Sequence, residues 1–316
     1  MYHGVTDKRI INWTQVPAHE FRRQMKYIRR RCNPIALQKA VKISGKNSDD
    51  HNYSIGVTFD DGFKNNYTCA YPIMKTYNIP STVFLTISFM DKDPRYGGIL
   101  WTDYISSILQ STEKNHLDLT DFGLGHIDLS DNLKRYHAKG WICFELKKLD
   151  YEEKNRIIEE IGRRLESGVS EYDYGIFQSL DWDDVDRLSE DELMEFGAHT
   201  VSHEILPGLP QDIMEREILD SKKIIEDHIG KLVTAFAYPN GSFNDEVKGR
   251  VSSCFDCALT STEGLNHIGI DRYELRRFNI FNGMKMWEFK LAISGTMEFI
   301  GKFGRFLGQR SYYEIE

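Results

Sequence analysis

The sequence has few cysteines and no long hydrophobic run, and these absences exclude several classes of protein. The 316 residues contain five cysteines, an odd number spread widely along the chain. This usage argues against a disulfide framework and favours a reducing compartment. No run of about 18 apolar residues is present, so we expect no transmembrane helix. The first ten residues lack a hydrophobic signal core, so we expect a cytoplasmic protein, unless a start upstream of Met1 adds an anchor or an export signal.

Positive charge is also in the minority. The chain has 40 Lys and Arg against 48 Asp and Glu, a formal net charge of -8, so nucleic acid is not an expected partner. One basic run, residues 22–31, departs from this balance. Because Phe21, Met25 and Ile28 repeat beside it at helical spacing, we interpret the run as the outer face of a helix, with binding of an anionic glycan or lipid as the alternative. With 41% apolar and 12% aromatic residues, the composition is that of an ordinary globular enzyme.

Short apolar strands alternate with amphipathic helices along most of the chain. The predicted strands cover residues 55–59, 81–87, 196–198, 233–238, 256–260 and 277–281. Strand, helix and strand in repetition predict a parallel sheet, here with enough units for a barrel. Helical patterns break this rhythm at residues 91–176, which we predict to be a helical insertion with a loop at 120–130. The barrel is then expected to comprise residues 1–90 and 177–295, followed by an accessory tail at 296–316.

Two adjacent carboxylates, Asp60 and Asp61, follow the strand predicted at residues 55–59. Barrel enzymes place their chemistry at the carboxyl ends of the strands. Neighbouring side chains there point in different directions, so one carboxylate can bind a metal while the other faces the substrate or an attacking water. The Asp60-Asp61-Gly62 run is also consistent with a plain turn held by an Asx bond.

A pair of histidines, His199 and His203, follows a second predicted strand. Four residues of separation would place both imidazoles on one face of a helical turn, where they can bind one cation. Each histidine alone is consistent with a surface or core role. Together with Asp61 they predict a two-histidine, one-carboxylate site with open positions, which suits zinc or another first-row divalent ion acting on water.

Three motifs in this sequence resemble those of the polysaccharide deacetylase family, carbohydrate esterase family 4. They are Thr58-Phe59-Asp60-Asp61-Gly62, Gly197-Ala198-His199-Thr200-Val201-Ser202-His203 and Phe236-Ala237-Tyr238-Pro239-Asn240-Gly241. The resemblance covers residues 1–90 and 177–283, and the first two motifs together are highly specific. It implies a distorted (β/α) barrel that removes N-acetyl groups from N-acetylhexosamine units of a polysaccharide or glycan precursor.

The resemblance also implies roles for individual residues. Asp61, His199 and His203 would bind one divalent metal, zinc first, with cobalt, nickel and manganese as alternatives, and Asp60 would be the general base. The third motif would contact the substrate through Tyr238, Pro239 and Asn240. A backbone N–H beside Tyr238 would stabilise the oxyanion of the tetrahedral intermediate.

The sequence departs from the family pattern in two places. Many members hold the base with an Arg two residues before the proline of the third motif, where this chain has Ala237; Arg277 is our candidate substitute, or else a surface cation. Many members also carry a general-acid histidine on a late strand, but no histidine follows His267. His3, at the end of the first strand, is our candidate for that acid, with a purely structural role as the alternative.

Two other functions are compatible with the same residues. One is hydrolysis of a non-sugar amide, as in the allantoinase-like and cyclic-imide relatives of the fold. The other is a glycan-binding pseudoenzyme without turnover, which the missing Arg and late His would favour. Retention of Asp60 beside Asp61 and both histidines argues against the pseudoenzyme.

Overall fold

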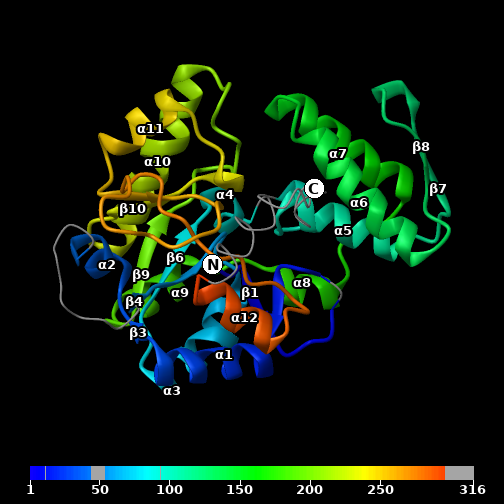
Figure 1. Cartoon of the computed structure of the whole chain (residues 1–316). Coiled ribbons are helices and arrows are strands. Elements are labelled where there is room, and N and C mark those ends of the chain that lie inside the picture. The colour runs from blue at the N-terminus through cyan, green and yellow to red at the C-terminus, as the bar shows by residue number, and fades with distance from the viewer. Residues whose placement is uncertain (11, 44–53, 93, 296–316) are drawn as a thin grey trace, which may run out of the picture. The chain divides into compact units, whose positions relative to one another are not determined.

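The computed structural model describes residues 1–10, 12–43, 54–92 and 94–295. The predicted tail at 296–316 lies outside the described residues. The chain forms two compact units: residues 1–87 with the segment from 182 onward, here the barrel unit, and residues 88–181, here the insertion unit (Figure 1). Each unit is described by itself below.

The barrel unit is built on parallel strands. Five of them form one sheet in the order β11-β10-β9-β6-β5, with every neighbouring pair parallel. The strands of the unit are β1 (Gly4–Thr6), β2 (Gln15–Pro17), β3 (Asn33–Pro34), β4 (Ser54–Ile55), β5 (Val57–Phe59), β6 (Ser81–Leu85), β9 (Met194–Ala198), β10 (Ala235–Ala237) and β11 (Cys257–Leu259). Because all five strands of the sheet run the same way, their carboxyl ends share one edge.

The sheet continues past both of its outer strands. Tyr2 pairs with Phe59 beside β5, and Leu275 pairs with Leu259 beside β11. The segment after Leu275 returns to the start of the chain, where the Ile280 N–H donates to the carbonyl of Met1 at 3.0 Å. The curled parallel sheet is that of the predicted distorted (β/α) barrel. The strand predicted at 277–281 is wrong, since this segment bonds to its neighbours without forming a regular strand.

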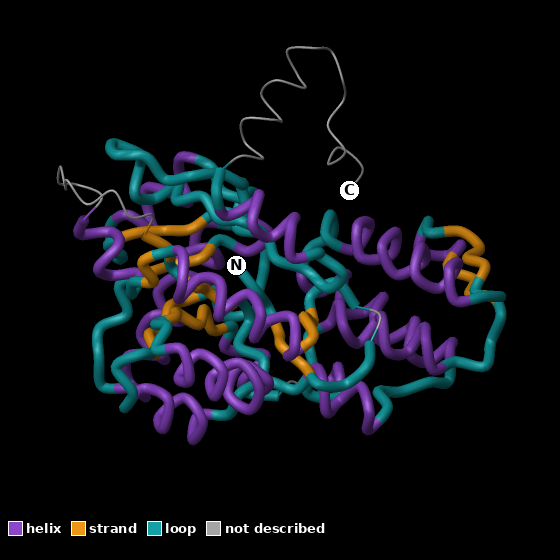
Figure 2. Tube along the Cα trace, turned by 60° about the horizontal axis from the view of Figure 1, so that its bottom comes forward, coloured by secondary structure: helices purple, strands orange, loops and turns teal. Residues whose placement is uncertain are grey.

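Helices cover the outside of the strands (Figure 2). Phe21, Met25 and Ile28 are the buried face of α1, as their spacing predicts. The helices of the barrel unit are α1 (Ala18–Arg31), α2 (Leu37–Ile43), the π-helix Asn66–Ala70, α3 (Tyr71–Tyr77), α9 (Trp182–Ser189), α10 (Gln211–Ile229), the 3₁₀ turn Pro239–Gly241, α11 (Asp245–Ser252) and α12 (Met286–Ile293); α4 (Ile87–Met90) begins at the boundary with the insertion unit. Across the described ranges, none of the helices combines the length and the apolar character that a membrane span needs.

The insertion unit has its own apolar core. Its elements are the 3₁₀ turn Pro94–Tyr96, α5 (Trp101–Ser111), β7 (His116–Leu119), the 3₁₀ turn Thr120–Phe122, β8 (Gly125–Asp128), α6 (Asn132–Leu146), α7 (Tyr151–Leu165) and α8 (Glu171–Phe177). The loop predicted at 120–130 is wrong for residues 125–128, which form β8 and pair with β7 in an antiparallel hairpin. Leu117, Leu119 and Ile127 are buried between exposed polar neighbours, a two-residue alternation that indicates half-buried strands.

Candidate functional site

The turn after β5 separates the two adjacent carboxylates. Asp61 and Gly62 both have left-handed backbone, with φ of 74° and 93°. Glycine adopts this conformation without cost, and aspartate tolerates it better than most residues. The Gly62 N–H donates to the carbonyl of Asp60 at 3.0 Å. Both side chains are buried, but the turn sends them to different partners.

Asp60 is held by Arg277. The guanidinium donates from Nη1 to Oδ1 at 2.6 Å and from Nη2 to Oδ2 at 2.8 Å, and each side chain is only 5% exposed. Nε of Arg277 donates to the carbonyl of Thr260 at 2.9 Å, which fixes the orientation of the guanidinium group. Burial by itself would raise the pKa of Asp60, but the Arg277 charge overrides it, so the pKa of this carboxyl lies well below its usual range.

Asp61 faces the two histidines. Its Oδ1 lies 3.6 Å from Nε2 of His199 and 3.5 Å from Nε2 of His203. Nδ1 of His199 is 2.7 Å from the carbonyl oxygen of Ala237. Because a carbonyl only accepts, Nδ1 must carry the proton, which leaves the lone pair of Nε2 directed toward Asp61. Burial lowers the pKa of His199, which favours this neutral form.

The histidines do not lie on a helical turn, contrary to the prediction. Thr200 and His203 have φ of 69° and 58°, values that end a right-handed helix. The loop is instead closed by the His203 N–H, which donates to Oγ1 of Thr200 at 2.9 Å. At its start, the His199 N–H donates to the carbonyl of Leu85 at 3.0 Å, in continuation of the β6–β9 pairing. The two imidazoles therefore converge through loop geometry rather than helical spacing.

The donor set of Asp61, His199 and His203 fits a divalent metal. One ligand atom from each residue lies within 4.8 Å of the others. Ligands of a tetrahedral zinc ion, bound at roughly 2.1 Å, are about 3.4 Å apart, close to the 3.5 and 3.6 Å between Asp61 and the imidazoles. Catalytic zinc sites use three protein ligands and keep further positions open. Arg277 and Asp60 form a separate pair beside this donor set.

Comparison with known proteins identifies the family. A family model described as polysaccharide deacetylase matches residues 47–254. The chain belongs to the polysaccharide deacetylase family. It is 20% identical over 286 residues to YxkH of Bacillus subtilis (strain 168), whose name assigns it to the polysaccharide deacetylases, and the alignment covers 90% of this chain and 71% of YxkH.

Solved structures show the same fold. The deacetylase PplD of Streptococcus pyogenes, in complex with acetate, superposes with a TM-score of 0.59 at 16% identity, covering 93% of this chain and 96% of that one. IcaB from Ammonifex degensii superposes with a TM-score of 0.57 at 15% identity, covering 93% of each chain. These likenesses confirm the barrel fold predicted from the polysaccharide deacetylase motifs.

The third deacetylase motif is mostly buried. The Tyr238 side chain is only 1% exposed, and its hydroxyl donates to the carbonyl of Tyr273 at 3.2 Å. Its N–H donates to the carbonyl of Leu259 at 3.1 Å, so this amide is engaged with β11 and is not a free oxyanion donor. Pro239 is also buried, whereas Asn240 is exposed. Of the three residues, Asn240 offers the accessible side chain for a substrate.

His3 lies on the Asp60 side of the barrel. Its carbonyl accepts a hydrogen bond from Nδ2 of Asn66 at 2.7 Å, and its ring packs edge-on against Trp13 with centroids 5.0 Å apart. Burial lowers the pKa of His3 to about 4; Asp60 raises it, and Arg277 lowers it further. Burial thus opposes the protonated imidazole that the predicted acid role needs, and the Asp60 carboxylate favours it.

Glu217 is a residue of the deacetylase site that the motifs did not indicate. From α10, its Oε2 accepts the N–H groups of Val201 and Ser202 at 2.9 and 2.8 Å, and its Oε1 accepts the Ser202 hydroxyl at 2.5 Å. It is buried, and burial raises its pKa against the lowering effect of Ser202. Glu217 thus ties the histidine loop to α10. Its position beside Ile218 on the buried face of the helix is the sequence signal that could have revealed it.

We expect Glu217→Gln to weaken metal binding by roughly 10–100-fold, the usual cost of losing an outer-shell contact. The amide keeps the size of the side chain but removes the negative charge, so the hydrogen bonds that the Val201 and Ser202 N–H groups donate to it become weaker. Competition with a chelating indicator measures the affinity. Glu215→Gln, a half-exposed change on the same helix, should leave the metal affinity unchanged. Equal effects of the two changes would contradict a positioning role for Glu217.

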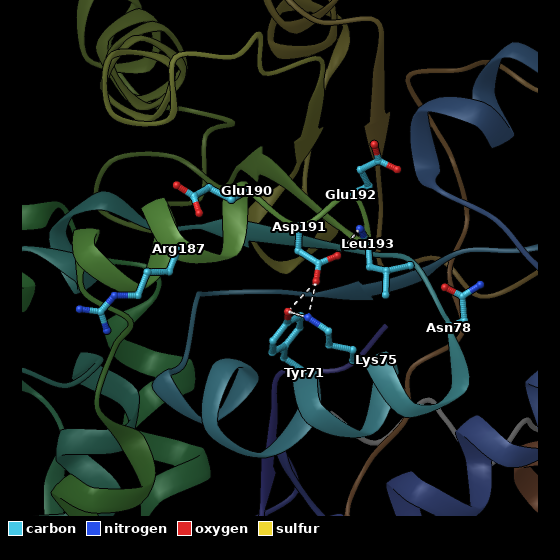
Figure 3. Close-up of a pocket in the computed structure, with 8 residues that line it drawn as sticks. All are labelled: Tyr71, Lys75, Asn78, Arg187, Glu190, Asp191, Glu192 and Leu193. Carbon is cyan, nitrogen blue, oxygen red and sulfur yellow. Dashed lines mark hydrogen bonds and ion pairs between the residues drawn. The ribbon is translucent and has the colours of Figure 1, made fainter.

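A surface hollow lies at the other end of the strands from this site (Figure 3). Asn78 and Leu193 on its rim precede the amino ends of β6 and β9. In the hollow, Oδ2 of Asp191 accepts from the Tyr71 hydroxyl at 2.6 Å and from Nζ of Lys75 at 3.0 Å. These polar groups bond to one another. We therefore interpret them as a structural hydrogen-bond and ion-pair cluster rather than as a second active site.

Proposed function

We propose that this chain is a metal-dependent N-deacetylase that removes acetyl groups from N-acetylhexosamine units of a polysaccharide or glycan precursor. The convergence of Asp61, His199 and His203 beside the buried Asp60–Arg277 pair carries this proposal. Membership of the polysaccharide deacetylase family supports the substrate class. The complex of PplD with acetate also agrees with it, because hydrolysis of an acetamide releases acetate.

Asp61, His199 and His203 would hold the metal, with zinc preferred and cobalt, nickel and manganese as alternatives. When bound, such a metal polarises an acyl oxygen and lowers the pKa of water. Asp60 accepts the proton of the attacking water, and Arg277 keeps the carboxylate fixed and ionised. The water oxygen bonds to the acyl carbon, and the C–N bond then breaks with its electron pair leaving on the amine nitrogen, which takes up a proton. Protonated Asp60 can return that proton, and His3 is the second candidate for this step.

Acetate release from N-acetylglucosamine oligomers tests the proposal. The protein loaded with zinc should release acetate, a chelator should abolish release, and zinc or cobalt should restore it. Release of ureide or imide products from cyclic amides instead would identify a non-sugar amide hydrolase on the same fold. Glycan binding without turnover under every metal would identify a pseudoenzyme and contradict the proposal.

A further inference from the structure

Helices α1 and α12 enclose a groove on the outside of the barrel unit. Five of its seven lining residues are cationic, and none is acidic. They are Arg23, Lys26, Tyr27, Arg30 and Arg31 from α1, with Met286 and Lys290 from α12. Figure 1 shows α12 lying against α1. The groove is therefore a concentrated positive surface on a chain whose net charge is -8.

Most of these cations have no acidic partner. Arg23 pairs with Glu20 at 2.8 Å. Lys26, Arg30 and Arg31 make no ion pair with another residue in the described part of the chain. Nζ of Lys290 sits 5.2 Å from the centroid of the Tyr27 ring, a cation–π contact that joins the two walls of the groove.

Stabilisation of helix α1 explains the presence of only some of these cations. Arg30 and Arg31 lie in the last turn of α1, where a cation is favoured by the helix dipole. Lys26 gains little from the dipole, and like charges four residues apart, as in Lys26 and Arg30, destabilise a helix. Lys290 comes from another helix. Bringing these cations together in one groove is unfavourable unless an anion binds there.

The shape of the surface favours a chain as the ligand. The apolar residues of α1, Phe21, Met25 and Ile28, are buried in the core and cannot insert into a bilayer. A groove between two helices fits a narrow polymer better than a flat membrane. Guanidinium groups bind carboxylate and phosphate with paired hydrogen bonds.

We propose that the α1–α12 groove binds a glycan chain that carries carboxylate or phosphate groups and so retains an anionic polymer on the protein. The glycan part of this inference rests on the proposed deacetylase function. The oxyanion part rests on the groove itself. None of the groove residues belongs to the Asp60 and Asp61 site, so binding and catalysis can be measured separately.

Binding of fluorescent oligogalacturonate and of phosphorylated dextran to the full chain tests the inference. We expect Lys26→Gln with Arg30→Gln to weaken binding at least about tenfold, since two charge-assisted contacts are lost. The control, Arg22→Gln with Arg29→Gln, removes the same charge from exposed positions of the same helix that lie outside the groove. It should weaken binding less than about threefold, because only the long-range electrostatic attraction is reduced. Circular dichroism verifies that both proteins fold.

Several outcomes would overturn the inference. They are equal losses in the two variants, no binding of either anionic glycan at low salt, or tighter binding to phosphatidylglycerol vesicles than to the glycans. Acetate release from neutral N-acetylglucosamine oligomers should be the same in both variants and the parent. Absence of that release in all three would contradict the deacetylase proposal, while the binding comparison would still report on the groove.

Discussion

Replacing Asp60 with asparagine is expected to lower kcat for acetate release by about 10²–10⁴-fold, the range of general-base catalysis. Asparagine has the same shape but cannot take the proton of the attacking water. The metal should stay bound, because the donor set consists of Asp61, His199 and His203. Steady-state kinetics and metal content, measured on the same preparation, give both results. His203→Ala is the matched comparison and should lose the metal itself.

The buried partner of Asp60 requires a second variant. Asp60→Asn leaves the Arg277 cation buried without its counterion, and breaking such a pair costs about 3–5 kcal/mol of stability. Asp60→Asn combined with Arg277→Met removes both charges and should recover much of that stability without recovering activity. Near-normal turnover by a folded Asp60→Asn protein would show that the base is another residue.

The sequence was most informative where local pattern and strand order act together. Asp60, Asp61 and His199 each follow a predicted strand, and parallel strands bring their carboxyl ends to one edge. Arg277 was chosen as the substitute for the arginine that many family members carry at the position of Ala237, and the structure sets it against Asp60. This holds although residues 277–281 form no regular strand, because backbone bonds still keep the segment beside β11: the Arg277 N–H donates to the carbonyl of Thr262 at 3.0 Å.

Features that depend on distant partners were not predictable from the same patterns. The loop from His199 to His203 takes its shape from left-handed residues and from Glu217 on α10, neither of which follows from a four-residue spacing. The amide of Tyr238 is used by Leu259 of β11, a pairing between two strands. The short hairpin in the insertion unit was not predicted because its Asp and Gly content is typical of a loop, although its apolar residues alternate as in a strand.

Replacing Arg277 with methionine is expected to destabilise the protein by about 3–5 kcal/mol, because the Asp60 carboxylate would remain buried without a counterion. Denaturant unfolding at pH 7 measures the loss. Arg272→Met, an exposed change nearby in the same segment, should stay within about 0.5 kcal/mol of the parent. Arg277→Lys keeps the charge but not the fork of donors, so its stability should be intermediate.

The pH dependence of the same variant separates a catalytic consequence from a structural one. In the parent protein Arg277 lowers the pKa of Asp60, so the ion pair stabilises the fold above the unfolded pKa of aspartate, about 3.9, and this stability is lost as the pH falls through the lower folded-state value. In Arg277→Met, burial acts without the opposing charge and raises the pKa of Asp60. The acid limb of kcat/KM should therefore move to higher pH, with activity recovering as Asp60 ionises. An unchanged acid limb together with unchanged stability would show that Arg277 does not control Asp60.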